Sequence, residues 1–133
     1  MNLYTNQNGE TMNTQDLKAI DPALGLMGEF SKVTKNTAGH IQKMRQEAIF
    51  TDGVFPAKVK ALAAALWGIS ARCEPCLKFY MLKAKELGAT EQEVGEFLAV
   101  ASAMGGCVGE MWALKAYQAI QGGAAPQDVC CTT

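Results

Sequence analysis

Apolar residues recur along this chain with the spacing of helices. They return in steps of three and four, which places them on one face of an amphipathic helix. The first group is Leu17, Ile20, Leu24, Met27, Phe30 and Val33, and the second is Ile41, Met44, Ala48 and Ile49. No window shows the strict alternation that is typical of strands, and no repeat of fixed period is present. The sequence therefore predicts an all-α fold.

Prolines, glycines and capping residues divide this pattern into about six helices. Proline is favoured in the first turn of a helix, and a Thr-x-x-Glu pattern caps a helix start. The expected starts are Asp21-Pro22, Pro56, Glu74-Pro75 and Thr90. Glycine ends or kinks a helix because it adopts the left-handed conformation readily. The expected breaks are Gly39, Gly53, Gly88, Gly105-Gly106 and Gly122-Gly123, so that the last helix spans residues 110–121.

One of the expected helices has no polar face. Residues 61–69 contain only alanine, leucine, tryptophan, glycine and isoleucine. A helix that is apolar on all sides has to be buried on all sides. A bundle of six short helices rarely covers such a helix completely, and large exposed apolar patches are rare on monomers. This segment therefore predicts that copies of the chain associate into a homo-oligomer.

The composition fits a single globular domain over residues 1–133. Hydrophobic residues make up 49% of the chain, which argues against disorder. The formal net charge of −1 and the lack of a basic face argue against nucleic acid as a partner. Residues 1–13 are polar, lack the apolar centre of a signal peptide and predict a flexible arm, and residues 124–133 predict a mobile tail. The longest apolar run is well below the ~18 residues of a membrane span, so we expect a cytoplasmic protein without a membrane partner.

The candidate chemistry lies directly after the apolar run, in the sequence Cys73-Glu74-Pro75-Cys76. Pro75 makes Glu74 the expected N-cap, so Cys76 falls among the unpaired N–H groups at the positive end of the helix dipole. This setting stabilises a thiolate. A separation of three residues places the two Cα atoms roughly 5–6 Å apart, within reach of a disulfide. The pair predicts reversible dithiol–disulfide chemistry, although free cysteines are also often simply buried.

Two further side chains are candidates for a role beside the cysteines. Tyr80 lies four residues after Cys76 on the same helical face, where its phenol can donate a hydrogen bond to a thiolate or a peroxide. Packing of its ring in the core is an equally good interpretation. Glu110 can supply a carboxylate only if its helix faces the pair, for example from a neighbouring subunit. Glu74 is the other carboxylate to consider, and exposure to solvent or capping is the more common role of such residues.

The remaining cysteines and the only histidine carry weaker signals. Cys107 follows a glycine pair and is expected to be a buried small residue. Cys130 and Cys131 are adjacent thiols on the tail that can pass electrons to the first pair or bind a soft metal or metalloid, and a tail without a role is the alternative. His40 stands alone, which excludes a multi-histidine metal site within one chain, and the sequence implies no cofactor.

Residues 59–114 resemble the alkylhydroperoxidase D-like, carboxymuconolactone decarboxylase family. The matching features, in order, are the apolar helix, the C-x-x-C pair, Gly88-Ala89-Thr90 followed by acidic residues, and Gly105-Gly106. The resemblance implies an all-α fold that is built around a helical hairpin and assembled as trimers or hexamers. It also implies that the cysteine pair reduces a peroxide and that a separate dithiol protein donates electrons. In the family the second cysteine attacks and the first resolves, whereas in a C-x-x-C thiol exchanger the first cysteine is usually the nucleophile. Both assignments stay open, and the helix start favours Cys76.

Three positions depart from the proton-relay pattern of the family's peroxidase branch. By this resemblance, the peroxidase branch has a glutamate where this chain has Ala61 and commonly a histidine where it has Tyr80. Some members also have a histidine where this chain has Pro75. The decarboxylases of the superfamily lack the cysteine pair, so the pair favours the redox branch. The hypotheses are therefore a thiol-dependent peroxide reductase with Cys73 and Cys76 as catalytic residues, a soft-metal or metalloid-binding thiol protein, and an oligomer whose peroxidase site has decayed.

Overall fold

The computed structural model describes residues 14–122, and the regular elements among them are all helical. In chain order they are α1 (Thr14–Ile20), the 3-10 helix η1 (Pro22–Leu26), α2 (Met27–Val33), α3 (Thr37–Ala48), α4 (Ala57–Ser70), α5 (Glu74–Glu86) and α6 (Glu91–Ile120). No strand occurs in this part of the chain, so the predicted all-α class is confirmed. The arm and the tail that we expected at residues 1–13 and 124–133 lie outside the described residues.

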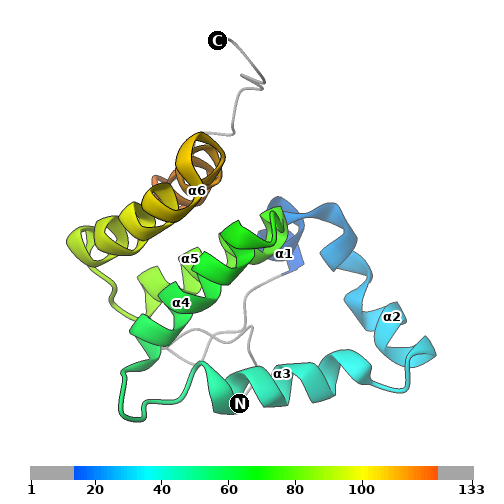
Figure 1. Ribbon diagram of the computed structural model, residues 1–133. Helices are drawn as coiled ribbons and strands as arrows, with labels where there is room; N and C mark the ends of the chain where they lie inside the picture. The colour runs from blue at the N-terminus through cyan, green and yellow to red at the C-terminus, as the bar shows by residue number, and fades with distance from the viewer. Residues whose placement is uncertain (1–13, 123–133) are drawn as a thin grey trace.

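Helices α4, α5 and α6 form the body of the molecule, and residues 14–48 form a limb beside it (Figure 1). Each body helix packs against the other two, α2 packs against α3, and α1 reaches α5. The core between the body helices consists mainly of small and branched side chains. Its members include Ala61, Leu62, Ala65, Ile69, Leu77, Met81, Ala84, Val94, Leu98, Ala113 and Ala116. Because so many of these residues are alanines, the helix axes can approach closely.

The closest approach of α4 and α5 is made by backbone at Gly68. A Cβ atom added to Gly68 would lie 2.9 Å from the backbone nitrogen of Leu77 and 3.3 Å from the Cβ atom of Cys76. The carbonyl oxygen of Gly68 also accepts a hydrogen bond of 2.9 Å from the N–H of Cys73. The start of α5 is therefore fixed against the last turns of α4.

Several of the expected helix ends are confirmed. The carboxylate of Asp21 accepts a hydrogen bond of 2.9 Å from the N–H of Ala23, although the chain first forms the 3-10 helix η1 and only then α2. The hydroxyl of Thr90 accepts from the N–H of Glu93, and the carboxylate of Glu93 accepts from the N–H of Thr90, which completes the predicted capping box. Gly88 has a φ of +96°, as expected for the residue that ends α5.

Glu93 also joins α6 to α4 through an ion pair of 2.9 Å with Lys58. The hydrogen bond from Lys58 and the bond from the Thr90 N–H hold the pKa of the Glu93 carboxyl below its ordinary value. A carboxyl group with a lowered pKa stabilises the folded state above its ordinary pKa. That contribution is lost as the pH falls through the lowered value.

The helix break that we expected at Gly39 lies elsewhere. Gly39 is inside α3, and the chain turns at Lys35 and Asn36, which have φ values of +53° and +62°. Asparagine tolerates the left-handed conformation better than most residues with a Cβ atom, so it can end α2 without a glycine. Gly39 serves a different need, since a Cβ atom there would overlap the side chain of Asn36.

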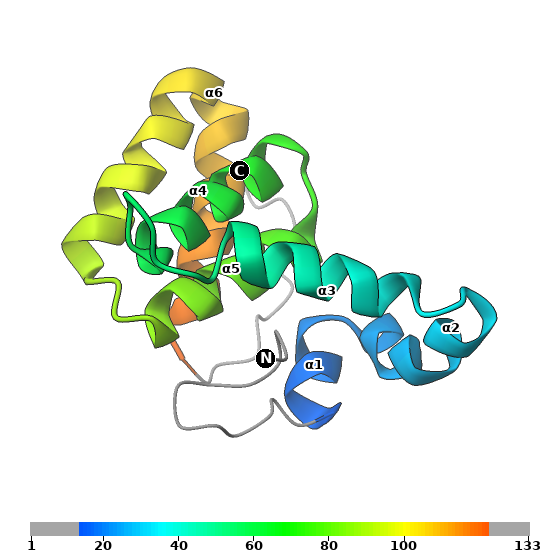
Figure 2. The ribbon, with the colours of Figure 1, turned by 90° about the horizontal axis from the view of Figure 1, so that it is seen from below.

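Helix α6 is a hairpin of two arms, residues 91–105 and residues 107–120. Gly106 has a φ of +59° and a ψ of −142°, so the expected kink is confirmed, and the second arm begins three residues earlier than predicted. The second arm folds back on the first (Figure 2). A Cβ atom on Gly109 would overlap the carbonyl of Ala101, and the Tyr117 hydroxyl donates a hydrogen bond of 2.7 Å to the Glu91 carboxylate.

By length and hydropathy alone, α6 is the one helix among the described residues that qualifies as a candidate membrane span. A straight span needs about 20 consecutive apolar residues. Because the backbone reverses direction at Gly106, each arm of α6 is shorter than that.

An apolar surface remains uncovered where α4 and α6 meet. Trp67 is 71% exposed, so one chain does not bury the apolar segment of α4 on all sides, as expected from the sequence for a bundle of this size. The neighbouring exposed residues of α6 are Val100, Met104, Val108, Met111 and Leu114. Of these, Val100, Met104 and Val108 line a groove of about 620 Å³, together with Leu66 of α4 and Trp112 of α6. No described element of the chain covers this face.

We propose that further copies of the chain cover this face, in a trimer or a hexamer. Light scattering coupled to size exclusion is expected to give three or six chains for the wild type. Trp67→Glu places a charge on the face and is expected to shift the mass to a single chain, because burying an unpaired carboxylate is strongly unfavourable. Val54→Glu is the matched control, since Val54 is 97% exposed on the loop before α4 and lies outside the face. A wild-type protein that elutes as a monomer contradicts the proposal.

The contact at Gly68 gives a test of the fold. Gly68→Ala is expected to lower the free energy of unfolding by about 1–3 kcal/mol, because the added methyl group meets backbone atoms that cannot move aside. Gly95→Ala is the control: Gly95 also lies in a helix, but nothing lies within 4 Å of its added Cβ atom, so it should be stabilising by up to ~1 kcal/mol. Urea denaturation of the two variants measures the difference, and equal effects would show that α4 and α5 are not in contact at Gly68.

Candidate functional site

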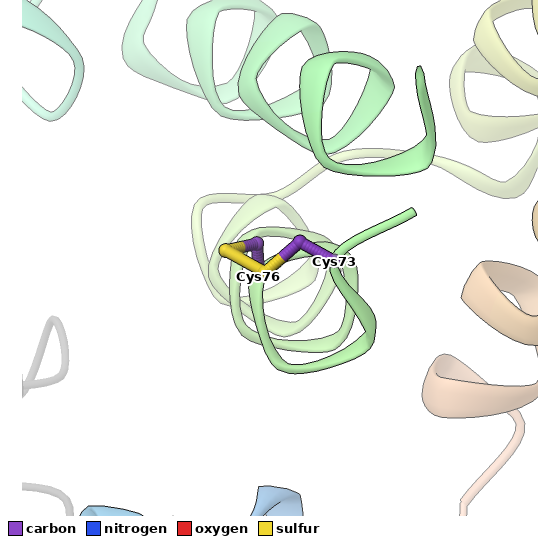
Figure 3. The surroundings of a disulfide bond; sticks show 2 residues. All are labelled: Cys73 and Cys76. Atoms are coloured by element: carbon purple, nitrogen blue, oxygen red, sulfur yellow. A yellow bond between two sulfur atoms is a disulfide. The ribbon is translucent and has the colours of Figure 1, made fainter. Parts of the chain in front are cut away.

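The two cysteines of the C-x-x-C sequence lie at the start of α5 and form a disulfide (Figure 3). Their Cα atoms are 5.2 Å apart, which agrees with the separation expected from the sequence. Both residues are partly exposed. The pair is therefore within reach of an oxidant or of a second dithiol.

The capping residue of α5 differs by one position from the prediction. Cys73, rather than Glu74, is the N-cap, with extended backbone angles of −94° and 97°. Glu74 and Pro75 are then the first two residues of the helix, a position that also suits proline because its missing N–H has no partner in the first turn. Cys76 follows as the third residue. Both sulfur atoms thus belong to the end of the helix where backbone N–H groups stabilise negative charge.

The turn between α4 and α5 holds Cys73 in place. Its N–H donates to the carbonyl of Gly68, and the N–H of Arg72 donates to the carbonyl of Ile69, which is the Schellman arrangement of a helix end. Arg72 takes the left-handed position that is usually occupied by glycine, with a φ of +54°. This conformation costs a residue with a Cβ atom roughly 1 kcal/mol. The hydrogen bonds of the turn offset that cost, and they fix the direction in which α5 begins.

Cys76 opens onto a small pocket of about 110 Å³ between the body and the limb. Helix α5 contributes Pro75, Cys76, Phe79 and Tyr80, whereas the limb contributes Leu24 from η1, Met27 from α2 and Arg45 from α3. Cys73 does not line this pocket. No local pattern indicates the three limb residues, because they precede Cys76 by 31 to 52 positions and reach it only through the tertiary fold.

Tyr80 lies beside Cys76 in this pocket and is 8% exposed. Its ring stacks on Phe50 at 6.0 Å and meets the edge of Phe79 at 5.3 Å. The packing interpretation of Tyr80 is therefore correct for its ring. A role for its hydroxyl as a hydrogen-bond donor toward sulfur or peroxide stays a prediction.

The carboxylates considered from the sequence are not in this pocket. Glu74 pairs with Lys78 at 3.1 Å and lies 4.0 Å from the ammonium group of Lys115, so its charge is largely balanced. Glu110 is exposed on the second arm of α6 and does not line the Cys76 pocket within one chain. Its contribution from a neighbouring subunit stays a prediction.

Cys107 is exposed, which corrects the expectation that it is a buried small residue. It follows the kink at Gly106, where the α6 hairpin reverses direction at the outside of the body. His40 is also exposed. Within residues 14–122, no three residues among histidine, cysteine, aspartate and glutamate come together as a metal site. Cys130 and Cys131, the alternative metal ligands, lie outside the described residues.

The sequence matches the carboxymuconolactone decarboxylase family over residues 37–119, from α3 to the end of the body. The chain belongs to this family. This chain is 32% identical to an uncharacterized protein of Cupriavidus necator over 107 residues. The match covers 77% of this chain and 91% of the relative. A crystal structure of a carboxymuconolactone decarboxylase family protein from Legionella pneumophila, in its apo form, matches with a TM-score of 0.70 and 25% identity. That match covers 80% of this chain and 95% of the other.

The geometry of this family member predicts that the disulfide forms reversibly in solution. Peptide mapping of the oxidised protein is expected to join Cys73 to Cys76, because their Cα separation suits a bridge without movement of the backbone. Treatment with a dithiol should return both to free thiols. Cys107 serves as an internal reference, since it is exposed yet has no described partner. A map that pairs Cys76 with Cys107 instead would overturn this prediction.

Proposed function

We propose that this protein is a thiol-dependent oxidoreductase that reduces peroxides through Cys73 and Cys76. One observation carries the proposal: the sulfur pair lies at the positive end of α5, and one of its members lines a small pocket. The first feature favours the thiolate form, which is the nucleophile in thiol chemistry. The second provides a place where an oxidant can approach the sulfur atom.

Cys76 is the attacking residue in this scheme, because it lines the pocket and Cys73 does not. Its thiolate attacks one peroxide oxygen, so that an S–O bond forms, the O–O bond breaks, and the electron pair leaves on the second oxygen, which takes up a proton. The sulfur becomes a sulfenic acid. Cys73 then attacks that sulfur and releases water, which forms the disulfide. A separate dithiol protein supplies the two electrons and two protons that restore both thiols.

The scheme works without the relay residues of the peroxidase branch. Ala61, at the position of the relay glutamate, is fully buried and brings only a methyl group into the core. A positioned general base typically contributes about 10²–10⁴-fold to a rate. Deprotonation of Cys76 therefore depends on the helix start and on solvent, and we expect slow turnover relative to family members with the complete relay.

Oxidation of the reduced protein by one equivalent of hydrogen peroxide tests the proposal. Intact mass is expected to fall by two units as the disulfide forms. Cys76→Ser should abolish this change, whereas Cys73→Ser should leave a sulfenic acid that a dimedone probe traps. Cys107→Ser is the control and should behave as the wild type. An unchanged mass in the wild type would instead support a site that has lost its peroxidase chemistry.

The hydroxyl of Tyr80 is expected to assist the step in which the O–O bond breaks. It can donate a hydrogen bond to the leaving oxygen, and a hydrogen bond of ~1 kcal/mol corresponds to roughly a fivefold change in rate. Tyr80→Phe keeps the ring stack on Phe50 and should slow disulfide formation by about that factor. Stopped-flow mixing with peroxide measures the rate. If Tyr80→Phe reacts as fast as the wild type, the tyrosine contributes packing alone.

A further inference from the structure

Among the described residues that line the Cys76 pocket, Arg45 is the one with a permanent charge. It lies in the last turn of α3 and is partly buried. Apart from Cys76 and Tyr80, the other residues of the lining are apolar: Leu24, Met27, Pro75 and Phe79. A partly buried arginine beside apolar side chains is less hydrated than one on an open surface, so it interacts more strongly with an anion that binds there.

Arg45 makes no ion pair with a carboxylate among residues 17–122. The ion pairs in this part of the chain are made by Lys58, Lys78, Lys83 and Lys115, and none involves an arginine. Glu74, the acidic residue nearest in sequence to Cys76, is already paired with Lys78. The guanidinium group of Arg45 is therefore available to bind an anion in the pocket.

The protein holds Arg45 at this place by contacts at the end of α3. The carbonyl of Arg45 accepts hydrogen bonds from the N–H groups of Ile49 and Phe50, at 2.8 Å and 3.3 Å. The ring of Phe50 then stacks on Tyr80, which itself lines the pocket. The backbone of Arg45 is thus linked to α5 through Phe50 and Tyr80.

We propose that Arg45 binds the anionic group of a small substrate beside Cys76, and that the substrates are short-chain hydroperoxides that carry a carboxylate. This inference rests on the proposed function. A guanidinium group binds a carboxylate through two parallel hydrogen bonds, which orients the substrate as well as holding it. A pocket of 110 Å³ has roughly the volume of three to four water molecules in the liquid. This size suits a chain of a few carbon atoms.

A hydroperoxy acid reacts with Cys76 in the same way as other peroxides. The Cys76 thiolate attacks the terminal oxygen of the hydroperoxide, the S–O bond forms and the O–O bond breaks. The electron pair stays on the inner oxygen, which takes a proton and becomes an alcohol. The products are a hydroxy acid and the sulfenic acid of Cys76, and Arg45 keeps its charge throughout.

Alkylation of the reduced protein isolates the anion-binding step from peroxide chemistry. Iodoacetate and iodoacetamide are similar in size and differ in charge, so the ratio of their rates at Cys76 reports an anion site. A general change in thiolate content alters both rates alike and cancels in the ratio. Arg45→Gln is expected to lower this ratio about tenfold or more, the effect of losing a charge-assisted hydrogen bond. Arg45→Lys should keep part of it, because the charge remains.

Two controls accompany the measurement. Lys43→Gln removes an exposed charge from the same helix and should leave the ratio unchanged. Cys73, read in the same peptide digest, lies outside the pocket and should show no dependence on Arg45. A ratio at Cys76 that is the same in wild type and Arg45→Gln, in variants that keep the helical circular dichroism signal, overturns the proposal. An equal fall of the iodoacetate to iodoacetamide rate ratio at Cys73, or at Cys76 in Lys43→Gln, also overturns the proposal.

The substrate class is tested by oxidation of Cys76 with a short hydroperoxy acid and with its methyl ester. The wild type should react faster with the acid than with the ester, and in Arg45→Gln the ratio of these two rates should fall toward one. Equal rates with acid and ester in the wild type would refute the assignment of substrate. If neither compound oxidises Cys76, the proposed function fails, whereas the alkylation ratio still decides whether Arg45 binds anions there.

Discussion

The backbone contact between α4 and α5 at Gly68 is the constraint on which the rest of this structure depends. With no side chain at Gly68, the last turns of α4 lie directly against the first turns of α5. The carbonyl of the same residue accepts the hydrogen bond that places Cys73 at the N-cap. The position of the sulfur pair, the direction of α5 and the face that Tyr80 presents all follow from this one contact. The core of small side chains around it lets three helices approach closely enough to hold it.

Features that depend on neighbouring residues were predictable from the sequence. Proline in a first turn, a Thr-x-x-Glu pattern and a left-handed glycine act through the backbone within a few positions, so Asp21, Thr90 and Gly88 were assigned correctly. The same reasoning missed the N-cap of α5 by one residue, because proline suits both the first and the second position of a helix. The N-cap is Cys73 instead of Glu74. It also placed a break at Gly39, because it did not weigh the ability of Asn36 to turn the chain without a glycine.

Features that depend on distant parts of the chain were not predictable. The spacing of the cysteines indicated their chemistry, but nothing near them in sequence indicated that Arg45 lines the same pocket. Apolar character alone predicted that Cys107 is buried, and the reversal of α6 at Gly106 exposes it. Likewise, the apolar segment of α4 correctly indicated a helix, while the exposure of Trp67 depends on which faces the rest of the chain covers.

The division of the pocket between body and limb has a consequence for how function can diverge in this fold. The sulfur pair belongs to the α4–α5 hairpin, whose geometry is set by a tight backbone contact, so that hairpin tolerates little change. Arg45, which lines the pocket beside Cys76, comes from a separate helix that is joined to α5 through the ring of Phe50. Substitutions in α3 can therefore alter which molecules are accepted while the redox couple stays intact. If Arg45 selects the substrate as proposed, two proteins with the same cysteine hairpin can accept different molecules, and the residue at its position reports on the substrate where the cysteines do not.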